Sequence, residues 1–161
     1  MAVTVSVKSN VKSIQKNLNK FVNKFPRITR KALLQASFQL QAIIKELTRR
    51  EQDFRRRRFA PYSEGYLKTL QREGKPTKID LFNTGRMLGS ITGKVESKSK
   101  ASVFFNNNEM TRRALFNQVL NEPNSQFFGF DNKTEKIIAK QFERFLDKEI
   151  RRLGLWVQER I

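Results

Sequence analysis

The organisation of the chain follows from LLQASFQLQAIIKEL, residues 33–47. Its apolar side chains recur every three or four residues, which is the period of one face of an α-helix. They are Leu33, Ala36, Leu40, Ile43, Ile44 and Leu47. The pattern predicts a long amphipathic helix near residues 27–54, and such a helix is stable only when its apolar face packs on another element.

The preceding residues predict a second amphipathic helix. Its apolar face consists of Val11, Ile14, Leu18, Phe21, Val22 and Phe25. Lysines recur every fourth residue on the opposite side, at Lys12, Lys16, Lys20 and Lys24. Proline has no backbone N–H and its ring crowds the preceding turn, so Pro26 is expected to end this helix. Residues 3–7 alternate Val with Thr or Ser, which predicts a short strand.

Shorter patterns predict the elements that follow. Ser63 is expected to cap a short helix. Residues 92–96 and 101–106 are expected to pair as a hairpin around the polar turn between them. Residues 110–120 are predicted to form another helix.

The C-terminal part completes the predicted fold. Asp131 is a candidate N-cap of a helix near residues 131–153, because an aspartate at this position can accept a hydrogen bond from the first turn. The predicted class is α+β, with several amphipathic helices packed on a small antiparallel sheet. We expect a single domain over residues 1–161, with an extended connecting arm at about residues 55–83.

The composition limits the chemistry that the chain can perform. Lys and Arg number 33 against 15 Asp and Glu, a formal net charge of +18, which favours polyanionic neighbours such as nucleic acid or an acidic protein surface. The absence of Cys and His excludes disulfides, thiolate or imidazole metal ligands and histidine-based triads. No apolar run approaches the roughly 20 residues of a transmembrane helix, and the first ten residues lack the apolar core of a signal peptide. A soluble, unsecreted protein with no membrane partner is expected.

A Gly-bounded apolar segment, KIDLFNTGRMLGS, occupies residues 78–90. Neither Gly85 nor Gly89 is followed by Lys and then Ser or Thr, so the segment is not a phosphate-binding P-loop, and it lacks the spacing of a dinucleotide-binding loop. Packing explains the segment better: Thr84 is predicted to cap a two-turn helix that buries its apolar side. The residues of this structural motif are Asp80, Leu81, Thr84, Gly85, Met87, Leu88 and Ile91. No cofactor is expected.

One pattern has the residue types of a metal-dependent nuclease. Asp80 precedes Glu96-Ser97-Lys98 by about fifteen residues, and such carboxylates can hold Mg²⁺ while a lysine assists the attack. The spacing is loose, and Glu-x-Lys arises easily in so basic a chain. Solvated hairpin charges are the preferred interpretation, so no enzymatic activity is expected.

Positive charge is concentrated in the first 58 residues, which hold fifteen Lys or Arg and three Asp or Glu. Four consecutive arginines repel one another, which favours a loop over a helix and requires counter-charge. Because acidic residues are few, we expect these arginines to face DNA or an acidic partner rather than an internal network of ion pairs. The predicted contact residues are Arg55, Arg56, Arg57, Arg58, Lys12, Lys16, Lys20 and Lys24. No base-reading motif is present, so a DNA contact would be to the backbone and sensitive to salt.

Three segments in a fixed order carry a resemblance to a known family. They are Phe59-Ala60-Pro61-Tyr62-Ser63, then Gly65-Tyr66-Leu67-Lys68, then Asp80-Leu81-x-x-Thr84-Gly85-x-Met87-Leu88-x-Ser90-Ile91 with a hairpin after it. This order resembles the phage virion-morphogenesis family, the tail-completion proteins of the phage Mu type. PNSQFFGF, residues 123–130, is similar to a late family segment but lacks its arginine, and MTRRALFNQVL stands where the family has a histidine-containing segment. The similarity covers roughly residues 28–150.

The resemblance implies a non-enzymatic structural protein of a tailed phage, assembled in the host cytoplasm and located in the neck or tail of the virion. It implies tail completion or head–tail joining by a ring of six or twelve copies. Connector proteins and tail terminator or tube proteins are the implied neighbours, and genomic DNA in the lumen is a further expected contact. The alternative from the residues alone is a non-specific basic DNA-binding protein, with the nuclease as a distant third.

Overall fold

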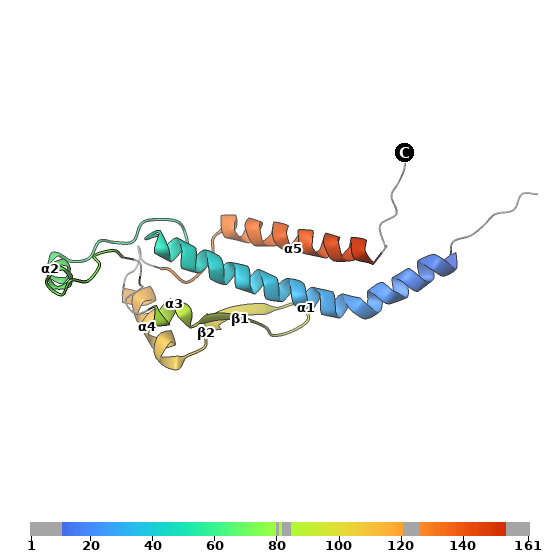
Figure 1. The fold of residues 1–161 in the computed structure, drawn as a ribbon, viewed down its shortest axis with the longest axis horizontal. Helices are drawn as coiled ribbons and strands as arrows, with labels where there is room; N and C mark the ends of the chain where they lie inside the picture. Colours follow the sequence, from blue (N-terminus) through green and yellow to red (C-terminus); the bar gives the residue numbers. More distant parts are fainter. Residues whose placement is uncertain (1–10, 80, 82–84, 121–125, 154–161) are drawn as a thin grey trace, which may run out of the picture.

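The computed structural model describes residues 11–79, 81, 85–120 and 126–153, of which residues 11–14 and 120 are described by their backbone alone. The elements in chain order are α1 (Val11–Arg49), α2 (Glu64–Arg72), α3 (Arg86–Gly89), β1 (Ile91–Val95), β2 (Ala101–Phe105), α4 (Asn108–Leu120) and α5 (Asn132–Arg152). The long α1 is central: α5 packs along one side of it and the β-hairpin along the other (Figure 1). The α+β class, the two predicted long helices and the small antiparallel sheet are confirmed, and of the two helices α1 packs on the sheet while α5 packs on α1.

α1 is a single helix of 39 residues with Pro26 inside it, so the prediction that Pro26 ends a first helix is wrong. Figure 1 shows that α1 bends in its N-terminal part. A bend is expected where a proline removes one hydrogen bond and its ring crowds the carbonyl four residues earlier, here that of Val22. The helix continues because its apolar pattern stays in phase across the proline, and Ile28 and Ala32 are buried in the following turns.

α1 ends at Arg49, a turn earlier than predicted. Glu51 has a φ of 60°, the left-handed conformation that closes many helices. The Glu51 N–H bonds to the Thr48 carbonyl at 3.0 Å, and the Gln52 N–H bonds to the Leu47 carbonyl at 2.9 Å. These two bonds form a Schellman motif, which satisfies carbonyls that would otherwise have extended the helix.

The sheet lies directly on α1. β1 and β2 are antiparallel, with Ile91 opposite Phe105, which confirms the predicted hairpin. The side-chain amide of Gln41 donates a hydrogen bond to the Ile91 carbonyl. A Cβ placed on Gly93 would come within 2.4 Å of the Ser37 hydroxyl oxygen. Glycine at this position therefore permits the close approach of strand and helix.

The core lies where α1, the sheet, α3 and α4 meet. Its buried side chains are Ile44, Phe59, Met87, Leu88, Ile91, Met110, Ala114 and Phe127. The prediction that Met87, Leu88 and Ile91 pack in the core is therefore confirmed. Leu81, another residue of the predicted motif, is half-buried against this cluster.

α3 differs from the helix predicted at this position. It is one turn rather than two, and its N-cap residue is Gly85, with a φ of 69° and no side-chain cap. The prediction of a helix capped by Thr84 is therefore wrong; Thr84 itself, like Asp80, lies outside the described residues. Ile91 does not extend the helix, because it pairs with Phe105 in the sheet.

Two predicted helix caps are confirmed. The Ser63 hydroxyl accepts the N–H of Tyr66 at 3.4 Å at the start of α2. The Asp131 carboxylate accepts the N–H of Thr134 at 2.8 Å at the start of α5. The predicted strand at residues 3–7 lies outside the described residues.

Residues 60–78 leave the body of the molecule and return to it, with α2 at the far end (Figure 1). We call this segment the α2 arm. α2 makes no extensive contact with another described helix or strand. It closes with Gly74 at a φ of 62° and with a bond of 2.9 Å from the Lys75 N–H to the Leu70 carbonyl. The far end of the arm is therefore a helix with its own C-terminal cap.

Candidate functional site

The arginine run 55–58 lies in a loop that follows α1. We call residues 51–59 the clasp loop. Asp53 is completely buried within it. The Asp53 carboxylate accepts the backbone N–H of Arg57 at 2.8 Å and pairs with the Arg57 guanidinium at 2.7 Å. A buried carboxylate is tolerated only when it is paired and hydrogen-bonded, so Arg57 is needed to maintain the loop.

Arg56 joins the clasp loop to the start of α5. Its guanidinium donates to the Asp131 carboxylate at 3.2 Å and to the Thr134 hydroxyl at 3.2 Å. The loop also packs on the chain just before α5, where a Cβ on Gly129 would lie 2.9 Å from the Phe54 ring. These contacts fix the position from which α5 runs along α1.

The Asp131 carboxylate contacts both the clasp loop and α5 at this junction. Burial raises the pKa of Asp131, but the hydrogen bonds from Thr134 and the charge of Arg56 outweigh burial, so the pKa lies below its ordinary value. The carboxylate therefore stays charged at neutral pH, where it both caps α5 and binds Arg56.

These contacts change the interpretation of the arginine run. The expectation that Arg55–Arg58 take no part in internal ion pairs is wrong for Arg56 and Arg57. Asp131 lies 75 residues from Arg56 in sequence, so a count of neighbouring acidic residues does not reveal it. The first and last arginines of the run are exposed. A contact of the run with DNA or an acidic partner stays a prediction.

The lysines that recur along α1 form a stripe, and those whose side chains are described are exposed. Lys16, Lys20 and Lys24 form no ion pair with any described side chain, and the side chain of Lys12 lies outside the described part. This part of α1 extends beyond both α5 and the sheet (Figure 1). Its role in binding a polyanion also stays a prediction.

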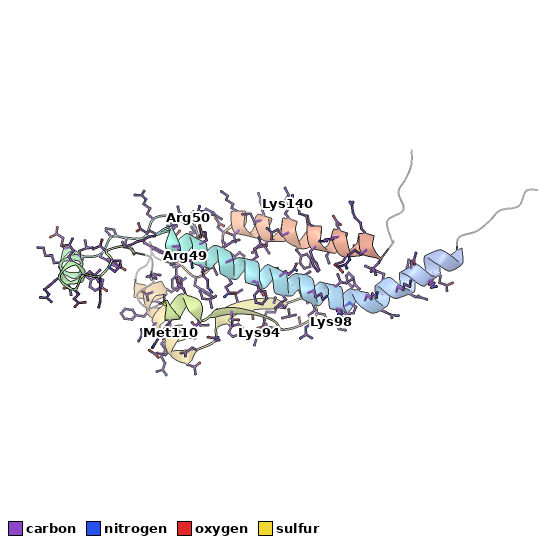
Figure 2. All side chains as sticks on the ribbon, viewed as in Figure 1. Arg49, Arg50, Lys94, Lys98, Met110 and Lys140 are labelled. Atoms are coloured by element: carbon purple, nitrogen blue, oxygen red, sulfur yellow. The ribbon has the colours of Figure 1, made fainter. Side chains whose placement is uncertain are left out.

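α5 carries a second set of cations, which the sequence interpretation missed. They recur every three or four residues, and we call them the α5 basic stripe: Lys133, Lys136, Lys140, Arg144 and Lys148. Side chains so spaced share one helix face, whereas the half-buried Ile138, Phe142 and Phe145 share the opposite face. Figure 2 shows Lys140 on the side of α5 that points away from α1. The period is the signal in the sequence, and the acidic residues between the cations hide it from a search for consecutive charges.

The end of α1 adds cations beside the start of α5. Figure 2 shows Arg49 and Arg50 at this end of the molecule. Burial lowers the pKa of Lys45, and the charge of Arg49 lowers it further, as expected where cations are crowded. Arg50 pairs with Glu46 at 2.8 Å.

Two groups of large apolar side chains are exposed, and they belong to elements that lie far apart, the N-terminal part of α1 and α4 (Figure 1). The α1 patch is Leu18, Val22 and Phe25, which are 54%, 61% and 42% exposed. The α4 patch is Leu115, Phe116 and Val119, which are 60%, 64% and 57% exposed. Concentrated apolar surface of this kind is typical of protein contacts.

The α1 patch continues a helix face that is covered farther along. Leu18 and Phe25 precede Ala36 and Ile43 by eighteen residues, which is about five turns and so the same face. Ala36 and Ile43 are half-buried. α1 has 39 residues and α5 has 21, so α5 is too short to cover the whole face.

In the nuclease pattern, Glu96 has other partners. Glu96 pairs with Lys100 at 2.9 Å and accepts the Ser102 hydroxyl at 2.8 Å, and these hydrogen bonds lower the pKa of Glu96. Lys98 lies at the hairpin turn (Figure 2), and Asp80 lies outside the described residues. Within the described ranges, no group of three or more acidic, His or Cys side chains is placed to hold a metal ion.

Two further findings bear on function. No helix in the described part of the chain has an apolar stretch long enough to cross a membrane. Comparisons with protein families, with curated proteins and with solved structures found no match to this chain. The surfaces described above and the resemblance of the motifs are therefore the basis for a function.

Proposed function

We propose that the chain is a structural virion protein of a tailed phage, which acts in tail completion or head–tail joining and assembles as a ring in the neck. The observation that carries the proposal is the pair of exposed apolar patches on two elements that lie far apart, the N-terminal part of α1 and α4. The motifs between residues 59 and 91 supply the link to the virion-morphogenesis family.

The position of the patches favours head-to-tail assembly. A contact between two different patches, repeated from copy to copy, forms a ring when the rotation between neighbours closes. Burial of apolar surface supplies about 25 cal/mol per Å², and three large side chains on each patch are available for it. The α1 patch of one copy and the α4 patch of the next are the surfaces that we assign to this contact.

The α2 arm supports the same proposal. It extends away from the core (Figure 1) and ends in a helix with no extensive contact to another described element. Tyr66 on this helix is 48% exposed. A segment of this length outside the core is usually functional, and reaching a neighbouring subunit is the use that a ring offers it.

The implied setting follows from the family resemblance. The protein is proposed to be non-enzymatic, to assemble in the host cytoplasm as six or twelve copies, and to reside in the virion neck or tail. Its proposed neighbours are connector proteins and tail terminator or tube proteins, with genomic DNA passing through the lumen.

The test is a mixing experiment with two variants. Val22→Glu removes the α1 patch and Phe116→Glu removes the α4 patch; both side chains are exposed, so each variant should fold. We expect the parent chain to form a closed ring by mass photometry, and each variant alone to be monomeric. An equimolar mixture should give a one-to-one dimer, because the partners together retain one intact pair of patches.

The matched control is Ile137→Glu, which places the same charge on an exposed apolar residue of α5 and should still assemble. The proposal fails if the parent chain is monomeric, if either variant still forms rings, or if the mixture yields no dimer.

A second candidate function is non-specific DNA binding by a monomer. The α5 basic stripe is the observation that favours it. A parent chain that stays monomeric and coats duplex DNA at low salt would support this candidate instead of the ring.

A further inference from the structure

We infer that the outer face of α5 binds the phosphate backbone of duplex DNA through the α5 basic stripe. The inference rests on the proposed function for its setting, in which DNA passes through the neck, although the site itself needs no ring. It deepens that function by moving the main nucleic-acid contact from the arginine run to a different element.

The cations of the stripe are available to a ligand. None of the five pairs with an acidic side chain in the described part of the chain, whereas Arg56 and Arg57 are held by Asp131 and Asp53. Freeing those two arginines for a phosphate would remove the charged partners of carboxylates that are partly or completely buried, which is unfavourable. The stripe can bind an anion without breaking an internal contact.

The spacing of the stripe suits an extended polyanion. Lys133 and Lys148 are separated by fifteen residues, or about 22 Å along the helix axis at 1.5 Å per residue. Duplex DNA carries one charge per about 1.7 Å of its axis, so several phosphates lie within reach of five cations. Charges placed about once per helical turn match an elongated ligand better than a single small anion.

The scaffold beneath the stripe is fixed. Ile138, Phe142 and Phe145 are half-buried on the opposite face of α5, and α5 packs along α1. The start of α5 is held by Asp131 and Arg56. Binding would therefore order only the long side chains, which keeps its entropic cost low.

The first half of the stripe should contribute most. Glu143 and Asp147 are exposed on the second half of α5, where they weaken the positive field. Lys133, Lys136 and Lys140 lie on the first half, and Lys133 is in the first turn, at the positive end of the helix dipole. Figure 2 places Arg49 at the same end of the molecule.

The expected recognition is independent of base sequence. Lysine and arginine side chains on an exposed helix face contact phosphates, which position a protein on DNA but carry no sequence information. Log affinity falls linearly with log salt concentration, because each phosphate contact releases a counterion. Each contact makes this negative slope steeper by about 0.9.

The experiment uses the full-length chain in the Val22→Glu background, so that ring assembly does not affect the result. The probe is a fluorescein-labelled 20-base-pair duplex, titrated by anisotropy at a series of NaCl concentrations. The Lys133→Gln/Lys136→Gln/Lys140→Gln variant should reduce the magnitude of the slope of log affinity against log salt by about 2 to 3. It should also weaken binding at least tenfold at low salt. The corresponding Lys→Arg triple should keep the parent slope, because it retains the charges.

The matched control is Lys16→Gln/Lys20→Gln/Lys24→Gln, which removes the same charge from α1 and should change the slope by less than about 1. Circular dichroism checks that each triple keeps the parent fold. Equal losses in the two Gln triples would overturn the inference, since binding would then follow net charge alone. Absence of DNA binding by the parent, or tighter binding of polyglutamate than of the duplex, would also overturn it. A failed mixing experiment with an intact stripe effect would reject the ring and retain this site.

Discussion

The carboxylate of Asp131 makes two contacts with its two oxygens. Oδ1 accepts the N–H of Thr134 at 2.8 Å, and Oδ2 accepts the Arg56 guanidinium at 3.2 Å. The first contact caps α5 and the second ties α5 to the clasp loop. Both contacts favour the charged form, which is why the pKa of Asp131 is lowered despite burial.

The lowered pKa predicts a pH dependence of stability in acid. A group whose pKa is depressed in the folded state stabilises the fold above its unfolded pKa, about 3.9 for Asp, and loses that contribution as the pH falls through the folded value. Asp131→Asn keeps a capping oxygen but removes the charge. The free energy of unfolding in urea should therefore be lower than for the parent at pH 7 and pH 5, and the difference should shrink at pH 3.

Arg56→Gln serves as the control for this prediction. It removes one of the causes of the shift, so the Asp131→Asn difference measured in that background should be smaller at pH 7. A difference between parent and Asp131→Asn that is the same at pH 7 and pH 3 would contradict the assignment.

At the scale of elements, apolar periodicity predicts which segments form helices and strands, because the hydrophobic face is written in local sequence. Most of α1, the hairpin and α5 follow from it, whereas the caps at Ser63 and Asp131 follow from the hydrogen-bonding capacity of their side chains. Local rules fail where distant packing decides. Pro26 does not end α1, since Ile28 and Ala32 bury the next turns. The contact of Arg56 with Asp131 could not be predicted, because the two residues lie 75 positions apart in the sequence.

The clasp loop yields a prediction about the contact between α1 and α5. Arg56→Gln/Arg57→Gln should lower the free energy of unfolding by about 1–3 kcal/mol, because the completely buried Asp53 and the half-buried Asp131 lose their charged partners. Arg55→Gln/Arg58→Gln removes the same charge from the exposed ends of the run and should change stability by less than about 0.5 kcal/mol. Thermal and urea unfolding measure both.

Equal effects of the two double variants would mean that the run acts through its total charge. In that case the internal pairing would not be what stabilises the loop.

At the scale of the whole molecule, the net charge is predictable from composition, but its distribution is not. In the sequence, the four consecutive arginines are the most conspicuous cations. In the fold, a longer cationic face lies on α5, and two of the arginines form ion pairs within the chain. The same holds for the two apolar patches: each is a pattern in the sequence, but only the fold shows that they are exposed and lie far apart. Exposure depends on which elements remain uncovered, and that is a property of the assembled chain.

The charge of +18 predicts a stability that depends on salt. Like charges repel more strongly in the compact state, and salt screens them. Raising NaCl from about 20 to about 200 mM should increase the free energy of unfolding of the monomeric Val22→Glu variant by on the order of 1 kcal/mol. The Lys133→Gln/Lys136→Gln/Lys140→Gln triple, with three fewer charges, should respond less. A stability that falls with salt would show that ion pairs outweigh the repulsion.

Pro26 lies between the α1 patch and the rest of the molecule, so the two surfaces assigned to assembly are joined through a bent rod. A ring of n copies closes only if each copy redirects its neighbour by a fixed angle, about 60° for six and about 30° for twelve. The bend at Pro26 contributes to that angle directly. In the proposed assembly, Pro26 therefore helps to set the curvature of the ring and the diameter of its opening. It does so because its backbone nitrogen carries no hydrogen and cannot complete the hydrogen bonding of α1.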